Sequence, residues 1–189
     1  MFTMMHIRPL DKSTMPIKDE YYVFSNDYSK VNFVVNMNDS RRLGILRDQA
    51  ISTNIPASFE CKSLKTFKPI EAVFDISVST KLLFDMDYAK PLVELDLYNN
   101  SLVPAKIVDK DYLYLHCYNI INILDDEVGF DFEELNAVAL ENRLVFRPSF
   151  ESIIVFFHKS VIDAIESIKK PSYAKPVKVA DWTMELEMS

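Results

Sequence analysis

Glycine is almost absent from this chain of 189 residues, and its scarcity limits the sites that the chain can build. Only Gly44 and Gly129 occur, where average usage would give roughly thirteen glycines in this length. Phosphate-binding loops of the Walker and dinucleotide-binding types need two or three glycines close together, because the backbone must approach the phosphates closely. The sequence therefore excludes both classes of nucleotide site.

The composition is otherwise that of a folded globular protein. Hydrophobic residues make up 49% of the chain and charged residues 26%, whereas disordered chains combine low hydrophobicity with high net charge. We expect one domain over residues 1–189, since this length suits a single core. Residues 1–70 carry few clear patterns, and residues 171–189 are expected to form a tail or a final strand.

Strands and short helices are both predicted along the chain. Aromatic and β-branched residues, or strict alternation, predict strands over residues 20–24, 31–37, 72–78, 93–97 and 112–118, with further apolar segments at 143–147 and 152–157. Residues 81–86 are expected to form a helix that Ser79 or Thr80 caps and Pro91 stops, and residues 132–139 one or two helical turns. The sequence predicts an α+β fold with a mixed or antiparallel sheet.

The last helix has the clearest pattern. Its apolar residues recur at helical spacing, Ser160 is the candidate N-cap, and Lys169-Lys170-Pro171 is the expected end. We therefore expect a C-terminal amphipathic helix. Together with the strands it predicts a core that includes Leu113, Leu115, Phe146, Ile154, Phe156, Ile162 and Ile165.

The strand over residues 112–118 has two chemically different faces. Alternation places Leu113, Leu115 and Cys117 on one face, which we expect in the core. The other face carries Tyr112, Tyr114, His116 and Tyr118, and we expect it to be partly wet.

Acidic residues are concentrated in the middle of the chain. The net charge is −7, but residues 71–141 hold four Lys/Arg and fifteen Asp/Glu, a net charge of −11. The densest cluster consists of Asp125, Asp126, Glu127, Asp131, Glu133 and Glu134. Such a surface repels nucleic acid, whose binding needs clustered Lys/Arg. Two interpretations stay open: a solvated face that keeps the protein in solution, or a docking surface for a basic partner.

Nothing in the sequence points to a membrane or to secretion. The longest run without a charged side chain has thirteen residues, 112–124, and a spanning helix needs about twenty. The N-terminus lacks a basic region followed by an apolar one. Cys61 and Cys117 are isolated, which favours buried reduced thiols. We expect a cytoplasmic protein.

Catalytic and metal-binding motifs are lacking. His6, His116 and His158 stand outside any metal or triad pattern, and the glycine at position 129 does not have the spacing of a calcium loop. Asp48, Glu60 and Lys62 loosely match two-metal nuclease sites, in which carboxylates hold magnesium. We predict no cofactor and no metal, and keep a magnesium-dependent hydrolase as the alternative.

A resemblance covers roughly residues 71–170. It is carried by four features: a strand that ends in Tyr118-Asn119, the following Asp125, the strand Leu144-Val145-Phe146-Arg147, and the strand Ile153-Ile154-Val155 before a helix. Together these features are similar to the C-terminal half of a group of bacterial immunity proteins. These proteins belong to polymorphic toxin systems. Where the family pattern carries a serine soon after the aspartate, this chain has Glu127 and Val128.

The resemblance implies a non-enzymatic protein that binds one cognate toxin and blocks it. The candidate contact residues are the acidic cluster together with the tyrosines, which often anchor interfaces: Asp125, Asp126, Glu127, Asp131, Glu133, Glu134, Tyr112, Tyr114 and Tyr118. A further alternative is a structural or regulatory module that self-associates through the aromatic strand face.

Overall fold

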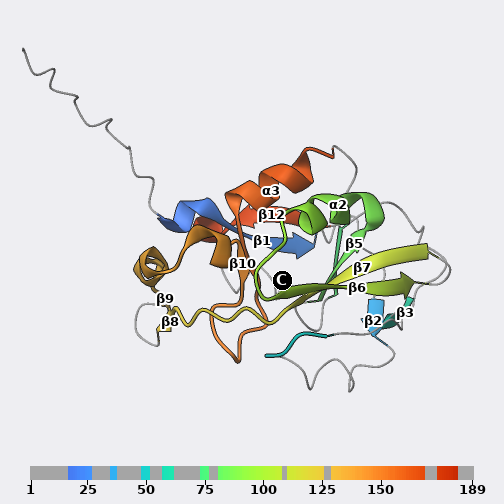
Figure 1. Cartoon of the computed structure of the whole chain (residues 1–189), viewed down its shortest axis with the longest axis horizontal. Helices are drawn as coiled ribbons and strands as arrows, with labels where there is room; N and C mark the ends of the chain where they lie inside the picture. The colour runs from blue at the N-terminus through green and yellow to red at the C-terminus, as the bar shows by residue number, and fades with distance from the viewer. Residues whose placement is uncertain are drawn as a thin grey trace, which may run out of the picture.

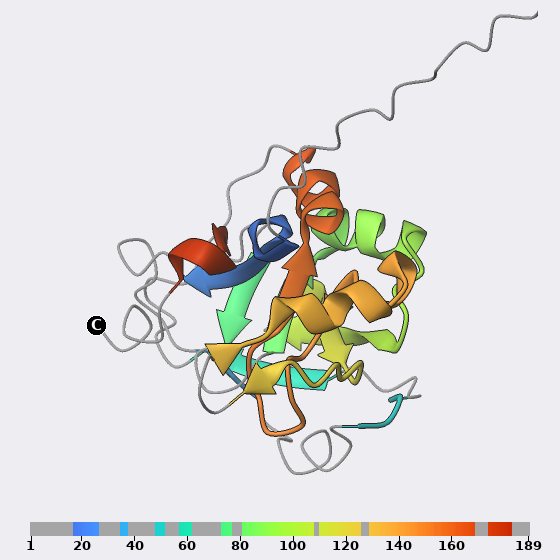
Figure 2. The same cartoon turned by 90° about the vertical axis from the view of Figure 1, so that its left-hand side faces the viewer.

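The computed structural model describes residues 17–26, 35–37, 48–51, 57–61, 73–76, 81–107, 110–125, 129–168 and 174–182. Two sheets, a short hairpin and several short helices pack together (Figures 1 and 2). The prediction of an α+β fold is confirmed, and the larger sheet is mixed. Neither α-helix within the described ranges is long and apolar enough to cross a membrane.

The smaller sheet joins the two ends of the chain. Its four antiparallel strands run in the order β10 (Val145–Phe146), β11 (Phe156–His158), β1 (Tyr21–Asn26) and β12 (Ala174–Lys178). The predicted early strand at residues 20–24 is therefore central, between two strands from the end of the chain. The expected tail or final strand is β12, followed by the 3₁₀ turn η4 (Val179–Asp181).

The larger sheet contains six strands. Their order is β2 (Val35–Met37), β3 (Ala57–Cys61), β6 (Asn100–Ile107), β7 (Lys110–Cys117), β5 (Lys81–Asp85) and β4 (Val73–Ile76). Only the β3–β6 pair is parallel among these strands. The longest strands, β6 and β7, form a hairpin in its middle, and the predicted strand at 112–118 is confirmed as β7.

The remaining elements are short. They are η1 (Ile17–Glu20), α2 (Met86–Glu94), β8 (Leu124–Asp125), β9 (Gly129–Phe130), η2 (Phe132–Ala137), η3 (Leu140–Asn142) and α3 (Lys159–Glu166). β8 and β9 pair as a hairpin in which Gly129 has φ +82°, a conformation that residues with a Cβ rarely adopt. The expected helical turns at 132–139 are η2.

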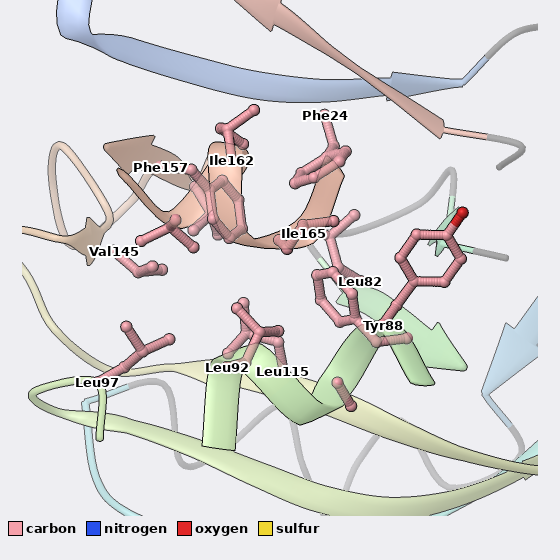
Figure 3. Packing of buried hydrophobic residues seen from close by; sticks show 14 of the residues in the cluster. Phe24, Leu82, Tyr88, Leu92, Leu97, Leu115, Val145, Phe157, Ile162 and Ile165 are labelled. Carbon is pink, nitrogen blue, oxygen red and sulfur yellow. The ribbon is translucent and has the colours of Figure 1, made fainter. Parts of the chain in front are cut away.

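Side chains from both sheets and from helices α2 and α3 meet in one core (Figure 3). Phe24 of β1 and Phe157 of β11 point toward Leu115 of β7, while Ile162 and Ile165 of α3 reach the same centre. A second cluster lies on the opposite face of the smaller sheet, because strand residues alternate between faces. It comprises Tyr21, Val23, Ile123, Phe132, Leu135, Phe146, Ile154, Phe156, Val179 and Trp182.

Most of the predicted core is confirmed. Leu115, Phe146, Ile154, Phe156, Ile162 and Ile165 are buried. Leu113 is half-buried and packs against the first cluster. Cys117 is a buried free thiol, as expected, and the side chain of Cys61 lies outside the described residues.

The predicted helix at 81–86 is wrong. Residues 81–85 form strand β5, which pairs with β4 on one side and with β7 on the other. The segment Leu82–Phe84 is apolar throughout because both faces of this strand are buried, and periodicity cannot separate such a short run from a buried helix. Helix α2 begins instead at Met86, where the Asp85 carboxylate accepts a hydrogen bond from the Asp87 backbone N–H at 3.1 Å.

The predicted strand at 93–97 and the expected stop at Pro91 are also wrong. Helix α2 continues through Pro91 to Glu94, and the Leu95 N–H donates to the carbonyl of Pro91 at 3.1 Å. The chain then turns at Asp96, with φ +46°. The alternation of apolar residues therefore reflects the end of a helix and a turn rather than an edge strand.

The N-cap of the last helix is His158, not Ser160. Helix α3 begins two residues earlier than expected, and Nδ1 of His158 accepts a hydrogen bond from the Ser160 N–H at 3.2 Å. The helix ends at Glu166, before the Lys169-Lys170-Pro171 stop that the sequence suggested. An imidazole acceptor can take the place of a hydroxyl at a helix start. The position of His158 between an apolar strand and the helix is itself typical of a capping or loop residue.

Candidate partner-binding surface

The acidic cluster is carried by one unit made of β8, β9 and η2. Asp125 is exposed on β8, and Glu133 and Glu134 are exposed in the first turn of η2. Asp131 is the N-cap of η2, and its carboxylate accepts a hydrogen bond from the Glu133 N–H at 2.9 Å. The remaining two acidic residues of the cluster, Asp126 and Glu127, lie outside the described residues.

This unit is anchored on the second core cluster. Phe132 and Leu135 of η2 are buried, and Phe132 stacks on Phe156 with ring centroids 5.7 Å apart. The Asp131 N–H donates to the carbonyl of Ile123 at 2.7 Å, which links the start of η2 to the residue before β8. The acidic side chains are therefore held on a packed base with Asp125, Glu133 and Glu134 turned to solvent.

Two of the three candidate tyrosines are not available to a partner, which corrects the expectation of a partly wet face. Tyr112 is 1% exposed and Tyr114 is 4% exposed, and only Tyr118 is half-buried. Burial along β7 includes residues of both faces, Tyr112, Tyr114 and His116 on one and Leu115 and Cys117 on the other. Burial raises the pKa of the Tyr114 phenol far above its usual value.

His116 shares this covered face. Its Nε2 lies 2.8 Å from the carbonyl oxygen of Gln49, and its ring stacks on Tyr118 with centroids 5.8 Å apart. The imidazole is 4% exposed. His116 is therefore a structural residue that holds the segment at 48–51 to the sheet, and it is more deeply buried than the sequence suggested.

Most of the proposed magnesium site lies outside the described residues. Asp48 is exposed, and the backbone of Glu60 on β3 pairs with that of Asn36 on β2. Lys62 and the side chain of Glu60 lie outside the described residues. Over the described ranges, no group of three or more His, Cys, Asp or Glu side chains is placed to hold a metal ion.

The buried thiol offers no nucleophile. Burial raises the pKa of Cys117 to about 12, so the thiolate that nucleophilic chemistry needs is scarce at neutral pH. The Cys117 Sγ contacts the carbonyl of Asn119 at 3.7 Å. Cys117 therefore behaves as a small apolar core residue.

Comparison with known proteins adds no assignment. No protein-family model matches the chain, and the search of curated proteins finds no significant match. The resemblance to immunity proteins therefore rests on the segments between residues 71 and 170 named above.

The environment of His158 predicts how stability depends on pH. Nδ1 accepts the Ser160 N–H, so the neutral ring carries its proton on Nε2, which lies 3.5 Å from a carboxylate oxygen of Glu20. Partial burial lowers the pKa of His158 below its usual value, despite the opposing effect of Glu20. A group with a lowered folded-state pKa stabilises the fold above its unfolded pKa, about 6.5, and loses that contribution as the pH falls.

We therefore expect His158→Asn, which keeps a cap acceptor without a titratable group, to remove a loss of stability below about pH 6.5. At pH 8 the variant should unfold at nearly the same urea concentration as the wild type, whereas His158→Ala should lose about 1 kcal/mol. Urea unfolding at pH 8 and pH 5 measures both effects. Parallel pH profiles for the wild type and His158→Asn would contradict the assignment.

Proposed function

We propose that this protein is an immunity-type protein that binds and neutralises a cognate bacterial toxin or secreted effector without catalysing a reaction. The observation that carries the proposal is the acidic unit, whose residues Asp125, Glu133 and Glu134 are exposed on a packed base. A negatively charged surface of this kind attracts a basic protein and speeds its capture. The resemblance over residues 71–170 supports the same function.

Charge placement around the unit also supports a basic partner. No lysine occurs between Lys110 and Lys159, and the two arginines of that stretch are Arg143 and Arg147. Arg147 is 4% exposed, and Arg143 donates a hydrogen bond from Nη1 to the Tyr21 hydroxyl at 3.2 Å. The stretch of sequence that carries the acidic unit therefore contributes few cations to the surface, and the exposed Lys18 lies on η1, which packs against η2.

Coexpression tests the proposal. The probe is the product of the reading frame immediately upstream of the gene, since toxin and immunity genes of such systems stand side by side. We expect this product to copurify with the chain in a defined stoichiometry and to slow bacterial growth only when the chain is absent. An upstream product that neither binds the chain nor affects growth contradicts the proposal.

A substitution separates this function from the magnesium-dependent alternative. If Asp48, Glu60 and Lys62 do not form a catalytic metal site, the Glu60→Ala variant should protect growth as well as the wild type does. Growth protection and nuclease activity of the purified protein with Mg²⁺ are the measurements. A hydrolytic activity that Glu60→Ala abolishes would favour the hydrolase, in which a carboxylate holds the metal ion.

A further inference from the structure

The connection between β10 and β11 is a rigid loop fixed from beneath by a buried arginine. Arg147 donates from Nη1 to the carbonyls of Phe150 and Ser152, at 3.3 Å and 3.4 Å. The Ser152 N–H donates to Oγ of Ser149 at 3.1 Å, and the Ile154 N–H donates to Oγ of Ser152 at 3.0 Å. These bonds hold the backbone of the loop in one conformation.

This rigid loop presents large apolar side chains to solvent. Phe150 is 46% exposed and Ile153 is 49% exposed, and Leu124 on the neighbouring β8 is 50% exposed. The Ile123 N–H donates to the carbonyl of Pro148 at 3.0 Å, which places the start of β8 beside the start of the loop. Both views of the molecule show the loop next to the β8–β9 hairpin (Figures 1 and 2).

Acidic side chains accompany these apolar residues. Asp125 follows Leu124 directly, and Glu151 follows Phe150, and both carboxylates are exposed. Single exposed apolar residues are common on protein surfaces, but exposed apolar residues that lie close together with polar residues at their rim mark interaction sites.

We infer that Leu124, Phe150 and Ile153, hereafter the apolar anchor, insert into an apolar depression on the partner that Lys and Arg side chains surround. This inference rests on the proposed function and names the chemistry of the partner's surface. A second copy of this chain fits the anchor poorly, because it would bring the same acidic residues together in a protein of net charge −7. The negative charge around the apolar anchor therefore favours a basic protein as the partner that binds there.

The anchor and the acidic unit should act on different rate constants. Long-range attraction by Asp125, Glu133 and Glu134 raises the association rate, whereas buried apolar contacts lower the dissociation rate. A few well-packed residues near the centre of an interface commonly contribute most of its affinity. Removing the anchor should therefore shorten the lifetime of the complex without slowing its formation.

The test compares two double variants in binding to the upstream gene product. Phe150→Ser/Ile153→Ser removes most of the anchor, and the matched control Met86→Ser/Val93→Ser changes two residues of α2 that are 51% and 60% exposed. We expect the anchor variant to dissociate at least about 30-fold faster, with an association rate within about twofold of the wild type. The control should match the wild type in both rates.

The outcomes separate this inference from the function on which it rests. Binding by the wild type with unchanged dissociation in the anchor variant overturns the inference alone, as does a control that dissociates equally fast. Failure of the wild type to bind overturns the proposed function and the inference with it. Sedimentation that finds a wild-type dimer and a monomeric anchor variant would show that a second copy occupies the anchor, and would also overturn it.

Discussion

Replacing Phe156 by alanine is expected to lower the free energy of unfolding by about 3–5 kcal/mol. Phe156 is fully buried, and its ring centroid lies 5.0 Å from that of Phe130, 5.7 Å from Phe132 and 5.6 Å from Phe146. These three rings come from β9, η2 and β10, so the cavity would open beneath the acidic unit as well as in the smaller sheet. Urea unfolding measures the loss.

Phe150→Ala is the matched control for this substitution. The same side chain is removed six positions earlier in the sequence, where it is exposed, and a change within about 0.5 kcal/mol is expected. Equal losses in the two variants would contradict the assignment of the second core cluster. A stable Phe150→Ala protein would also show that the loop tolerates the changes used to test the apolar anchor.

The parts of the fold that the sequence predicts best are those whose pattern extends over several residues. Strand β7 and helix α3 are examples, because alternation in one and helical spacing in the other continue long enough to separate the two periods. Residues Lys81–Asp85 could not be assigned in this way. Their strand conformation depends on pairing with β4, which comes just before them, and with β7, which follows only after α2 and β6.

Burial of Tyr112 and Tyr114 could not be predicted for a related reason. Alternating apolar and polar side chains predict a strand with one wet face only if the tyrosines count as polar. Tyrosine has a large apolar ring, and in the middle of the larger sheet both tyrosines are buried. Local pattern does not reveal whether other parts of the chain cover the second face of a sheet.

The sequence predicted the acidic residues of the candidate site but not its exposed apolar residues. Acidic residues such as Glu133 and Glu134 are exposed wherever they are unpaired, so composition located them. Phe150 and Ile153 resemble core residues in the sequence. Their exposure follows from the bonds that Arg147 makes inside the loop, and the one sequence signal is an aromatic residue within the turn-like stretch Pro148-Ser149-Phe150-Glu151-Ser152.

Reversing the charge of the acidic unit is expected to slow association with the upstream gene product by about 10-fold to 1,000-fold at 0.1 M salt. The variant carries lysine in place of Asp125, Asp126, Glu127, Glu133 and Glu134. Asp131 is kept, because its carboxylate caps η2 and its loss would weaken the fold as well as the charge. Stopped-flow binding measures the rate, and urea unfolding checks that stability is retained.

A pair of smaller variants controls for net charge. Glu133→Lys/Glu134→Lys changes the unit, whereas Glu94→Lys/Glu166→Lys makes the same change in net charge on exposed positions of α2 and α3. Only the first pair should slow association markedly. Equal slowing by both pairs would show that total charge matters and that the acidic unit has no special place in the interface.

The salt dependence of wild-type association tests the central claim most directly. If the upstream gene product is captured through the acidic unit, its association rate constant should fall steeply between 0.1 M and 1 M salt, because the Debye length shrinks from about 10 Å to about 3 Å. The five-lysine variant should lose this decrease. An association rate that is the same at both salt concentrations would contradict the account, since the acidic residues would then serve only to keep the protein in solution.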